Sequence, residues 1–126
     1  MEGKKFLRLD DIAAYKRAFH LANYVWEIVI KWRAMAQRTV GEQYIEAIDS
    51  MSANIAEGFG RYGKKDKVKF YRYSFGSMYE SLDWTEKARV RKLLTVEEYN
   101  KIFKELHELP REIHHLIKFT NDKLTF

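Results

Sequence analysis

The residues best suited to chemistry in this sequence form a cationic stretch, RYGKKDKVKFYR, at residues 61–72. The stretch contains six Lys and Arg and one acid, Asp66, which gives it a charge of +5. The whole chain contains 23 Lys and Arg and 18 Asp and Glu, which is also +5. The other residues therefore sum to zero, and the net charge is confined to one segment. Positive charge concentrated in this way is typical of a surface that binds a polyanion or an acidic partner.

The spacing of these cations suits a phosphate backbone. Lys65, Lys69 and Arg72 are four and three residues apart, so they would share one face of a helix. A tyrosine beside them could stack on an unpaired base, a contact worth about 1–3 kcal/mol. Phe70 and Tyr71 instead fall on apolar rows and are expected in the core. The predicted nucleic-acid-binding residues are Arg61, Tyr62, Lys64, Lys65, Lys69 and Arg72. The alternative is that the run is only the solvated start of a helix.

Other chemistries find less support in the sequence. The chain has no Cys, which excludes a thiolate nucleophile and a Cys-type zinc site. Glu112 and His115 have the E-x-x-H spacing of di-metal helix bundles, but the sequence lacks the second such pair that those sites need. The glycine-rich GFGRYGKK lacks the Ser or Thr that follows Lys in a nucleotide-binding loop. We therefore expect no catalytic residue, no metal and no cofactor.

Helices must position these residues, because turn-forming residues are scarce: the chain has one Pro and six Gly. Apolar residues recur at helical spacing in four segments, at about residues 11–36, 42–59, 64–92 and 96–120. The stretch QRTVGE, which contains Gly41, is the predicted break after the first segment. Thr95 and Glu98 form a capping box for the last helix, and Pro110 should kink it. The sequence predicts an all-α protein, an antiparallel up-down-up-down four-helix bundle, with residues 1–126 in a single domain.

The apolar residues also bear on location and partners. The longest apolar-leaning stretch, LANYVWEIVIKW, is interrupted by Asn23 and Glu27 and is too short to span a bilayer. The first residues contain no apolar stretch long enough for a signal peptide. We therefore expect a cytoplasmic protein with no membrane partner. The apolar arcs of the first and third helices are wider than a lone bundle needs, which favours an interface.

The stretch just before the cations, SANIAEGFGR, breaks two local rules. Asn54 is a poor residue for a helix interior, and Glu57 lies in the last turn of its helix, where the dipole disfavours an anion. One interpretation is structural: Glu57 pairs with Arg61, Asn54 bonds to a neighbouring helix, and Gly58 and Gly60 end the helix in a left-handed conformation. The other is functional: the polar row that these residues form with Ser50 belongs to a subunit or ligand surface.

SANIAEGFGR and the later KKDKVKFYRYSFGSMYES together resemble the four helix bundle protein family, the proteins encoded in intervening sequences of bacterial large-subunit ribosomal RNA genes. The resemblance covers about residues 11–120. Matching motif residues with an expected structural role are Ser50, Asn54, Glu57, Gly58, Gly76, Ser77 and Glu80. Ile45 and Glu46 stand where the family commonly has basic residues, and Lys67 stands where it often has an apolar one. A nucleic-acid role of those missing basic residues would not carry over to this chain.

The resemblance implies more about shape than about chemistry. It implies a four-helix bundle that assembles into a homo-oligomeric ring, typically a pentamer, and it implies no enzymatic activity. The accessory proteins of diversity-generating retroelements are a related group, whose pentamers bind a reverse transcriptase and nucleic acid. The first hypothesis is therefore a non-catalytic oligomeric bundle that binds RNA or DNA, with RNA favoured, through the basic residues at the start of the third helix. The alternative is a protein–protein scaffold or accessory subunit, for example of a reverse transcriptase, and an enzyme has the least support.

Overall fold

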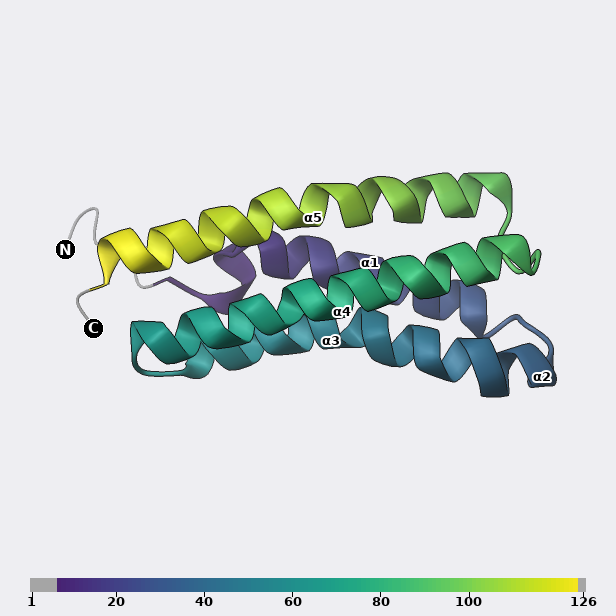
Figure 1. The fold of residues 1–126 in the computed structure, drawn as a ribbon, viewed down its shortest axis with the longest axis horizontal. Helices are drawn as coiled ribbons and strands as arrows, with labels where there is room; N and C mark the ends of the chain where they lie inside the picture. Colours follow the sequence, from purple (N-terminus) through teal and green to yellow (C-terminus); the bar gives the residue numbers. More distant parts are fainter. Residues whose placement is uncertain (1–6, 125–126) are drawn as a thin grey trace.

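Four long helices lie side by side along one axis in the part of the chain that the computed structural model describes, residues 7–124 (Figure 1). They are α1 (Ala13–Val29), α3 (Glu42–Gly60), α4 (Lys64–Val90) and α5 (Val96–Lys123). Short elements precede two of them: a 3-10 helix at Leu9–Asp11 before α1, and α2 (Ala34–Ala36) with a π-helix at Gln37–Gly41 before α3. Each long helix packs against two others, α3 and α4 most extensively and α1 and α5 least. The predicted all-α four-helix bundle is confirmed.

The first helix ends earlier than the sequence predicted. The structure ends α1 at Val29, and the predicted break at QRTVGE is instead helical and continuous with α3. Gly41 is therefore not a turn residue: it is right-handed, and a Cβ there would lie 2.9 Å from Val29 Cγ1. The glycine allows the start of α3 to pack closely against the end of α1. Gln37 Nε2 donates to the carbonyls of Val29 at 3.2 Å and Ile30 at 2.9 Å, which satisfies free acceptors at the end of α1.

The bounds of the other three helices agree with the sequence to within a few residues. Thr95 Oγ1 accepts from the Glu98 amide at 3.0 Å, and the Glu98 carboxylate accepts from the Thr95 amide at 2.9 Å, so the predicted capping box is present. Pro110 lies inside α5 without ending it. The turn after α4 contains Lys92 in the left-handed region, with φ of 62°.

The core is apolar with a few satisfied hydroxyls. Its fully buried side chains include Ile48, Met51 and Ile102. Tyr44 and Thr85 share a buried hydrogen bond of 2.7 Å, and burial raises the pKa of the Tyr44 phenol above its usual range. Within residues 7–124, no buried side-chain polar atom lacks a partner, and no helix is both long and apolar enough to cross a membrane.

The apolar arc of α1 is only partly covered. A stripe that includes Ala18 and Val25 is buried against the other helices. Phe19, Trp26 and Ile30 lie outside this stripe, and each is 45–50% exposed. The first helix therefore leaves an apolar row on the outside of the bundle, as its wide apolar arc indicated.

Candidate nucleic-acid interface

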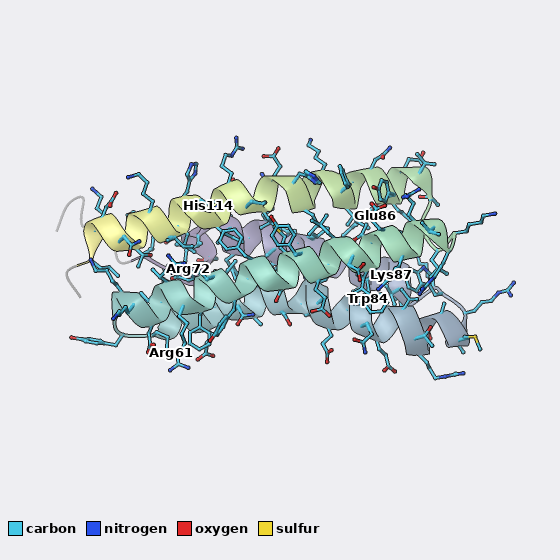
Figure 2. The ribbon with its side chains drawn as sticks, viewed as in Figure 1. Arg61, Arg72, Trp84, Glu86, Lys87 and His114 are labelled. Atoms are coloured by element: carbon cyan, nitrogen blue, oxygen red, sulfur yellow. The ribbon has the colours of Figure 1, made fainter. Side chains whose placement is uncertain are left out.

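The predicted basic residues occupy the first turns of α4 and the turn before it. Lys65, Lys69 and Arg72 are exposed and lie on the face of α4 opposite its buried stripe. Within residues 7–124, none of the three is in an ion pair. We call these three residues the cationic strip. In Figure 2, Arg72 lies between α4 and α5, whereas Arg61 lies at the opposite edge of α4, beside α3.

Three other cations of the segment are engaged by the fold. Arg61 pairs with Glu57 at 2.8 Å and lies over the ring of Phe70 at 4.5 Å. Lys64 Nζ donates to the carbonyl of Asn121 at 3.1 Å, near the end of α5. Lys67 Nζ donates to the carbonyl of Phe59 at 2.7 Å. Arg61 and Lys64 thus flank the cationic strip, but their positions are fixed by contacts within the chain.

Lys67 caps the end of α3. Its ammonium also lies 3.5 Å from the carbonyl of Gly58 and 5.4 Å from the ring centroid of Phe59. A cation at this place complements the negative end of the helix dipole. Burial nevertheless lowers the pKa of the Lys67 ammonium, because the charged form loses solvation. The sequence singled out Lys67 only as a departure from the family, and its role in the fold depends on contacts that sequence spacing does not reveal.

Of the two aromatic residues of the segment expected in the core, Tyr71 is there, but the prediction for Phe70 is wrong. Tyr71 is 2% exposed and belongs to the core, and burial raises its pKa to about 12. Phe70 is half-buried, with its ring centroid 5.3 Å from that of Tyr73. Tyr62 is 79% exposed at the tip of the bundle, next to Arg61. Of the three, Tyr62 is the side chain that a base could reach.

The polar row before the strip is mainly structural in this chain. The Glu57–Arg61 pair is present, as the structural interpretation predicted. The predicted bond from Asn54 to a neighbouring helix is wrong, because its Nδ2 donates to the carbonyl of Ser50 at 2.9 Å in the same helix. Ser50 in turn donates its hydroxyl to the carbonyl of Glu46 at 2.7 Å. Both side chains therefore donate their hydrogen bonds to carbonyls of their own helix, one turn earlier in the chain.

The predicted left-handed end of α3 at Gly58 and Gly60 is also wrong. The helix runs through Gly60, and neither glycine has a positive φ. A Cβ at Gly58 would lie 2.6 Å from the ring of Tyr71 and 2.9 Å from the carbonyl of Lys67. Gly58 is therefore needed because α4 approaches α3 too closely for any side chain, and not because of its backbone freedom.

Gly76 differs from Gly58 although both belong to the motif. It is exposed in the middle of α4, and a Cβ there would meet nothing within 4 Å. Glycine inside a helix costs about 0.5–1 kcal/mol relative to alanine. No contact within residues 7–124 explains this cost. Of its motif neighbours, Ser77 accepts a hydrogen bond from Ser81 through its carbonyl at 2.8 Å, and Glu80 is exposed.

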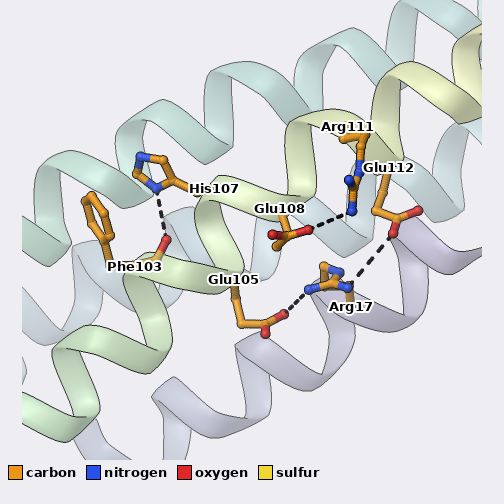
Figure 3. A network of polar contacts seen from close by, with 7 residues as sticks. All are labelled: Arg17, Phe103, Glu105, His107, Glu108, Arg111 and Glu112. Atoms are coloured by element: carbon orange, nitrogen blue, oxygen red, sulfur yellow. Dashed lines mark hydrogen bonds and ion pairs between the residues drawn. The ribbon is translucent and has the colours of Figure 1, made fainter.

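Some charges elsewhere on the bundle are paired within the chain. Figure 3 shows Arg17 of α1 held by two carboxylates of α5, with Glu105 at 2.8 Å and Glu112 at 3.9 Å. Glu112 therefore faces Arg17, not His115 in a metal site. Within the described residues, no group of three or more His, Asp or Glu could hold a metal ion. A groove of about 700 Å³ borders this network between α1 and α5. Acidic and basic side chains both line this groove, so it carries no single sign of charge.

A second charged row appears on α3, and sequence reasoning missed it. Glu42, Glu46 and Asp49 are exposed and follow one another at four and three residues, on the outer face of the helix. Within residues 7–124, none of the three is in an ion pair. Partial burial raises the pKa of the Asp49 carboxyl. We call these three residues the acidic row; the signal that could have found it is the spacing that it shares with the cationic strip.

Comparisons with known proteins agree with this fold. No curated protein sequence matches the chain significantly. A crystal structure of a protein of unknown function from the S23 ribosomal protein family of Bacteroides thetaiotaomicron is similar, with a TM-score of 0.74 and 16% identity. The match covers 84% of this chain and 99% of that one, and at this identity it shows the fold alone. The family model for the 23S rRNA-intervening sequence protein matches residues 10–115. Because that match covers most of the sequence, the chain belongs to the 23S rRNA-intervening sequence protein family.

Proposed function

We propose that this protein is a non-catalytic helical bundle that binds RNA through the cationic strip, with Arg61, Tyr62 and Lys64 at its flank. The observation that carries the proposal is the concentration of charge: residues 61–72 contain six cations and one acid, and the rest of the chain sums to zero. Lys65 lies in the first turn of α4, where the helix dipole disfavours a cation, and Lys69 lies one turn from both Lys65 and Arg72. Within residues 7–124, the one acid of the segment, Asp66, is in no ion pair with any of them. Charges kept against such local rules are typical of a binding surface.

The strip suits the backbone of a nucleic acid more than its bases. Its three cations lie along one helix face from Lys65 to Arg72, a rise of about 10 Å over two turns. Lysines and an arginine in this arrangement contact phosphates without reading sequence. Tyr62 adds an exposed ring on which an unpaired base can stack. Single-stranded or looped RNA fits this combination better than a regular duplex does, and the family's link to 23S rRNA supports RNA over DNA.

The test is a titration of fluorescently labelled single-stranded RNA at several salt concentrations. The strip variant Lys65→Gln, Lys69→Gln and Arg72→Gln should weaken binding strongly and reduce the slope of log K against log salt by about 2, since each lost phosphate contact removes about 0.7 on a single strand. The control variant Lys87→Gln, Arg89→Gln and Arg91→Gln removes the same charge from the other end of α4 and should change binding much less. Absent binding at low salt, or equal losses in the two variants, would overturn the proposal.

A second experiment separates stacking from charge. Replacing Tyr62 with Phe should keep RNA affinity, whereas replacing it with Ala should weaken binding by roughly 5-fold to 150-fold, the equivalent of about 1–3 kcal/mol. Polyphosphate, which has no bases, should bind wild type and the Ala variant equally. Equal RNA affinity of wild type and the Ala variant would remove Tyr62 from the site while leaving the strip in place.

A second candidate function is that of a scaffold or accessory subunit for a protein partner. The observation that favours it is the exposed apolar row of α1, Phe19, Trp26 and Ile30, which a lone bundle would not need. We propose that the protein forms homo-oligomers, with five subunits suggested by the family resemblance. Light scattering measures the subunit count directly, and a monomer at micromolar concentration would contradict this proposal.

A further inference from the structure

The acidic row and the cationic strip are complementary in both sign and spacing. Each has its charges at positions i, i+4 and i+7 on the outer face of a helix, and within residues 7–124 neither is neutralised. The rows belong to different helices, α3 and α4, and their members form no ion pair with each other within the chain. The acidic row of one copy could therefore meet the cationic strip of another, although the two rows do not meet within one copy.

Apolar side chains accompany the acidic row. Two grooves between α1 and α3, of about 540 and 280 Å³, are bordered by members of the row and by Trp26 in one case and Phe19 in the other. The partial burial that raises the pKa of Asp49 reflects this setting, because the carboxylate already sits against apolar atoms without a cation. Charge pairs at the rim of an interface set its register, while adjacent apolar contacts supply most of its affinity.

The strip also has neighbours that suit such a contact. Tyr73 and Tyr79 are 49% and 66% exposed on α4, on either side of Gly76. If α3 of one copy lies parallel to α4 of another, with each acid opposite a cation, the next residue of this register pairs Ala53 with Gly76. Two small residues at one crossing let helix backbones approach closely. The register thus gives a use to a glycine that nothing within residues 7–124 requires.

We infer that a second copy of this chain docks its acidic row, Glu42, Glu46 and Asp49, against the cationic strip and Gly76 of the first. The contact is heterologous, because different surfaces of the two copies meet. The pair then has one free row of each sign, an acidic row on one copy and a cationic strip on the other, so that the contact repeats until the assembly closes.

The contact has a consequence for RNA, which rests on the proposed function. A strip covered by a neighbour's acids cannot also hold phosphates, so self-association and RNA binding compete for the same three cations. The assembly is then a form with its RNA surface occluded, and RNA in excess should dissociate it. The docking itself does not depend on RNA.

The experiment reverses the charge of each row separately and then of both together. Glu42→Lys, Glu46→Lys and Asp49→Lys form one variant; Lys65→Glu, Lys69→Glu and Arg72→Glu form the other. Each should weaken self-association by at least about a hundredfold, because like charges then face each other. The chain with all six changes should assemble again, since every pair is restored with its sign exchanged. In an equimolar mixture of the two single-row variants, each variant can dock only on the other, so the mixture should also associate, in assemblies where the two alternate and only even-numbered rings close. Subunit count is measured by light scattering, and circular dichroism verifies folding.

Several outcomes would overturn the inference. A wild-type monomer at low salt excludes the contact. A folded single-row variant that assembles like wild type shows that the rows do not meet. Both single-row variants could lose assembly while still folded. If assembly then recovers neither in the six-residue variant nor in the mixture, the two rows do not pair with each other.

The same variants separate this inference from the proposed function. The acidic-row variant keeps the cationic strip, so it should lose assembly while its RNA affinity stays the same or rises. RNA binding that fails in every variant, with assembly following the charges as expected, removes the function and leaves the docking. Single-stranded RNA in excess should lower the subunit count of wild type; an unchanged count with RNA bound would overturn the competition.

Discussion

The two halves of α4 use the same kinds of side chain in opposite ways. In the second half, Asp83 pairs with Lys87 at 2.6 Å and Glu86 pairs with Arg89 at 3.0 Å, one turn apart along the helix. In the first half, the one acid is Asp66, and within residues 7–124 none of the three cations of the strip is in an ion pair. Opposite charges one turn apart stabilise the second half of the helix, whereas like charges one turn apart destabilise the first half. A composition average hides this difference, which is the main reason for placing function in the first half.

The first half remains folded because contacts below its surface hold it. Tyr71 packs against Gly58 of α3, Ser74 donates to the carbonyl of Met51 at 2.9 Å, and Lys67 caps the end of α3. These contacts connect α4 to α3, which is the most extensive helix pair in the bundle. The cationic strip therefore lies on the helix pair with the most extensive packing in the bundle. Rigid support of this kind favours a surface that must present charges in a fixed pattern.

The largest expected effect comes from the glycine beneath the strip. Gly58→Ala should lower the free energy of unfolding by about 1–3 kcal/mol, because the added methyl group overlaps the ring of Tyr71 and the backbone of Lys67. Gly76→Ala is the matched control in the middle of the helix and should raise it by up to about 1 kcal/mol, since a Cβ there meets open space. Urea denaturation measures both. Equal effects of the two substitutions would contradict the distinction between the glycines.

A smaller effect concerns the second half of α4, where the stability that one carboxylate contributes depends on pH. The Tyr99 hydroxyl donates to Glu86 and, with Arg89, lowers the pKa of that carboxyl. A carboxyl with a lowered folded-state pKa stabilises the fold above its unfolded value of about 4.3 and loses that contribution as the pH falls through the folded value. Tyr99→Phe should therefore cost about 0.5–1 kcal/mol at pH 7, a figure reduced for exposure, and less in acid.

The control for this prediction is Tyr79→Phe, which removes an exposed phenol from α4, the helix of Glu86, and not from α5, the helix of Tyr99. Its cost should be near zero at every pH. Thermal melts of both variants from pH 7 down to pH 3 give the comparison. A loss for Tyr99→Phe that is the same across this range would show that the carboxylate is not what the hydroxyl stabilises.

The sequence predicted the fold wherever local signals and tertiary contacts agree. Thr95 and Glu98 show where α5 begins because both partners of the capping box are only three residues apart. The end of the first helix was misplaced because Trp32 continues its apolar periodicity. In the structure Trp32 lies beyond the helix, with its indole Nε1 donating to the carbonyl of Leu93 at 2.9 Å and its ring 6.4 Å from that of Tyr44. A partly buried residue after the helix therefore has the sequence spacing of one more helical turn.

The candidate site, like the fold, was predictable where it depends on local spacing and not where it depends on tertiary contacts. Exposure of Lys65, Lys69 and Arg72 follows from helical spacing relative to the apolar stripe. The engagement of Lys64 could not be predicted, since its partner, the carbonyl of Asn121, lies 57 residues away. The acidic row was missed for a different reason: its charges are balanced by other segments in the chain total, so only its arrangement on α3 is informative.

The smallest expected effect is also the most direct comparison of the two halves. Lys69 lies one turn from both Lys65 and Arg72, and these two like charges, each costing about 0.2–0.5 kcal/mol, outweigh the one acid at the same spacing, Asp66. Lys69→Gln should therefore raise the free energy of unfolding by a few tenths of a kcal/mol, whereas Lys87→Gln should lower it by a similar amount because Asp83 loses its partner. Urea denaturation at low salt resolves the opposite signs, and both differences should shrink at high salt. A loss of stability for Lys69→Gln would mean that the strip contributes to the fold, and its charges would no longer need a function outside the chain to explain them.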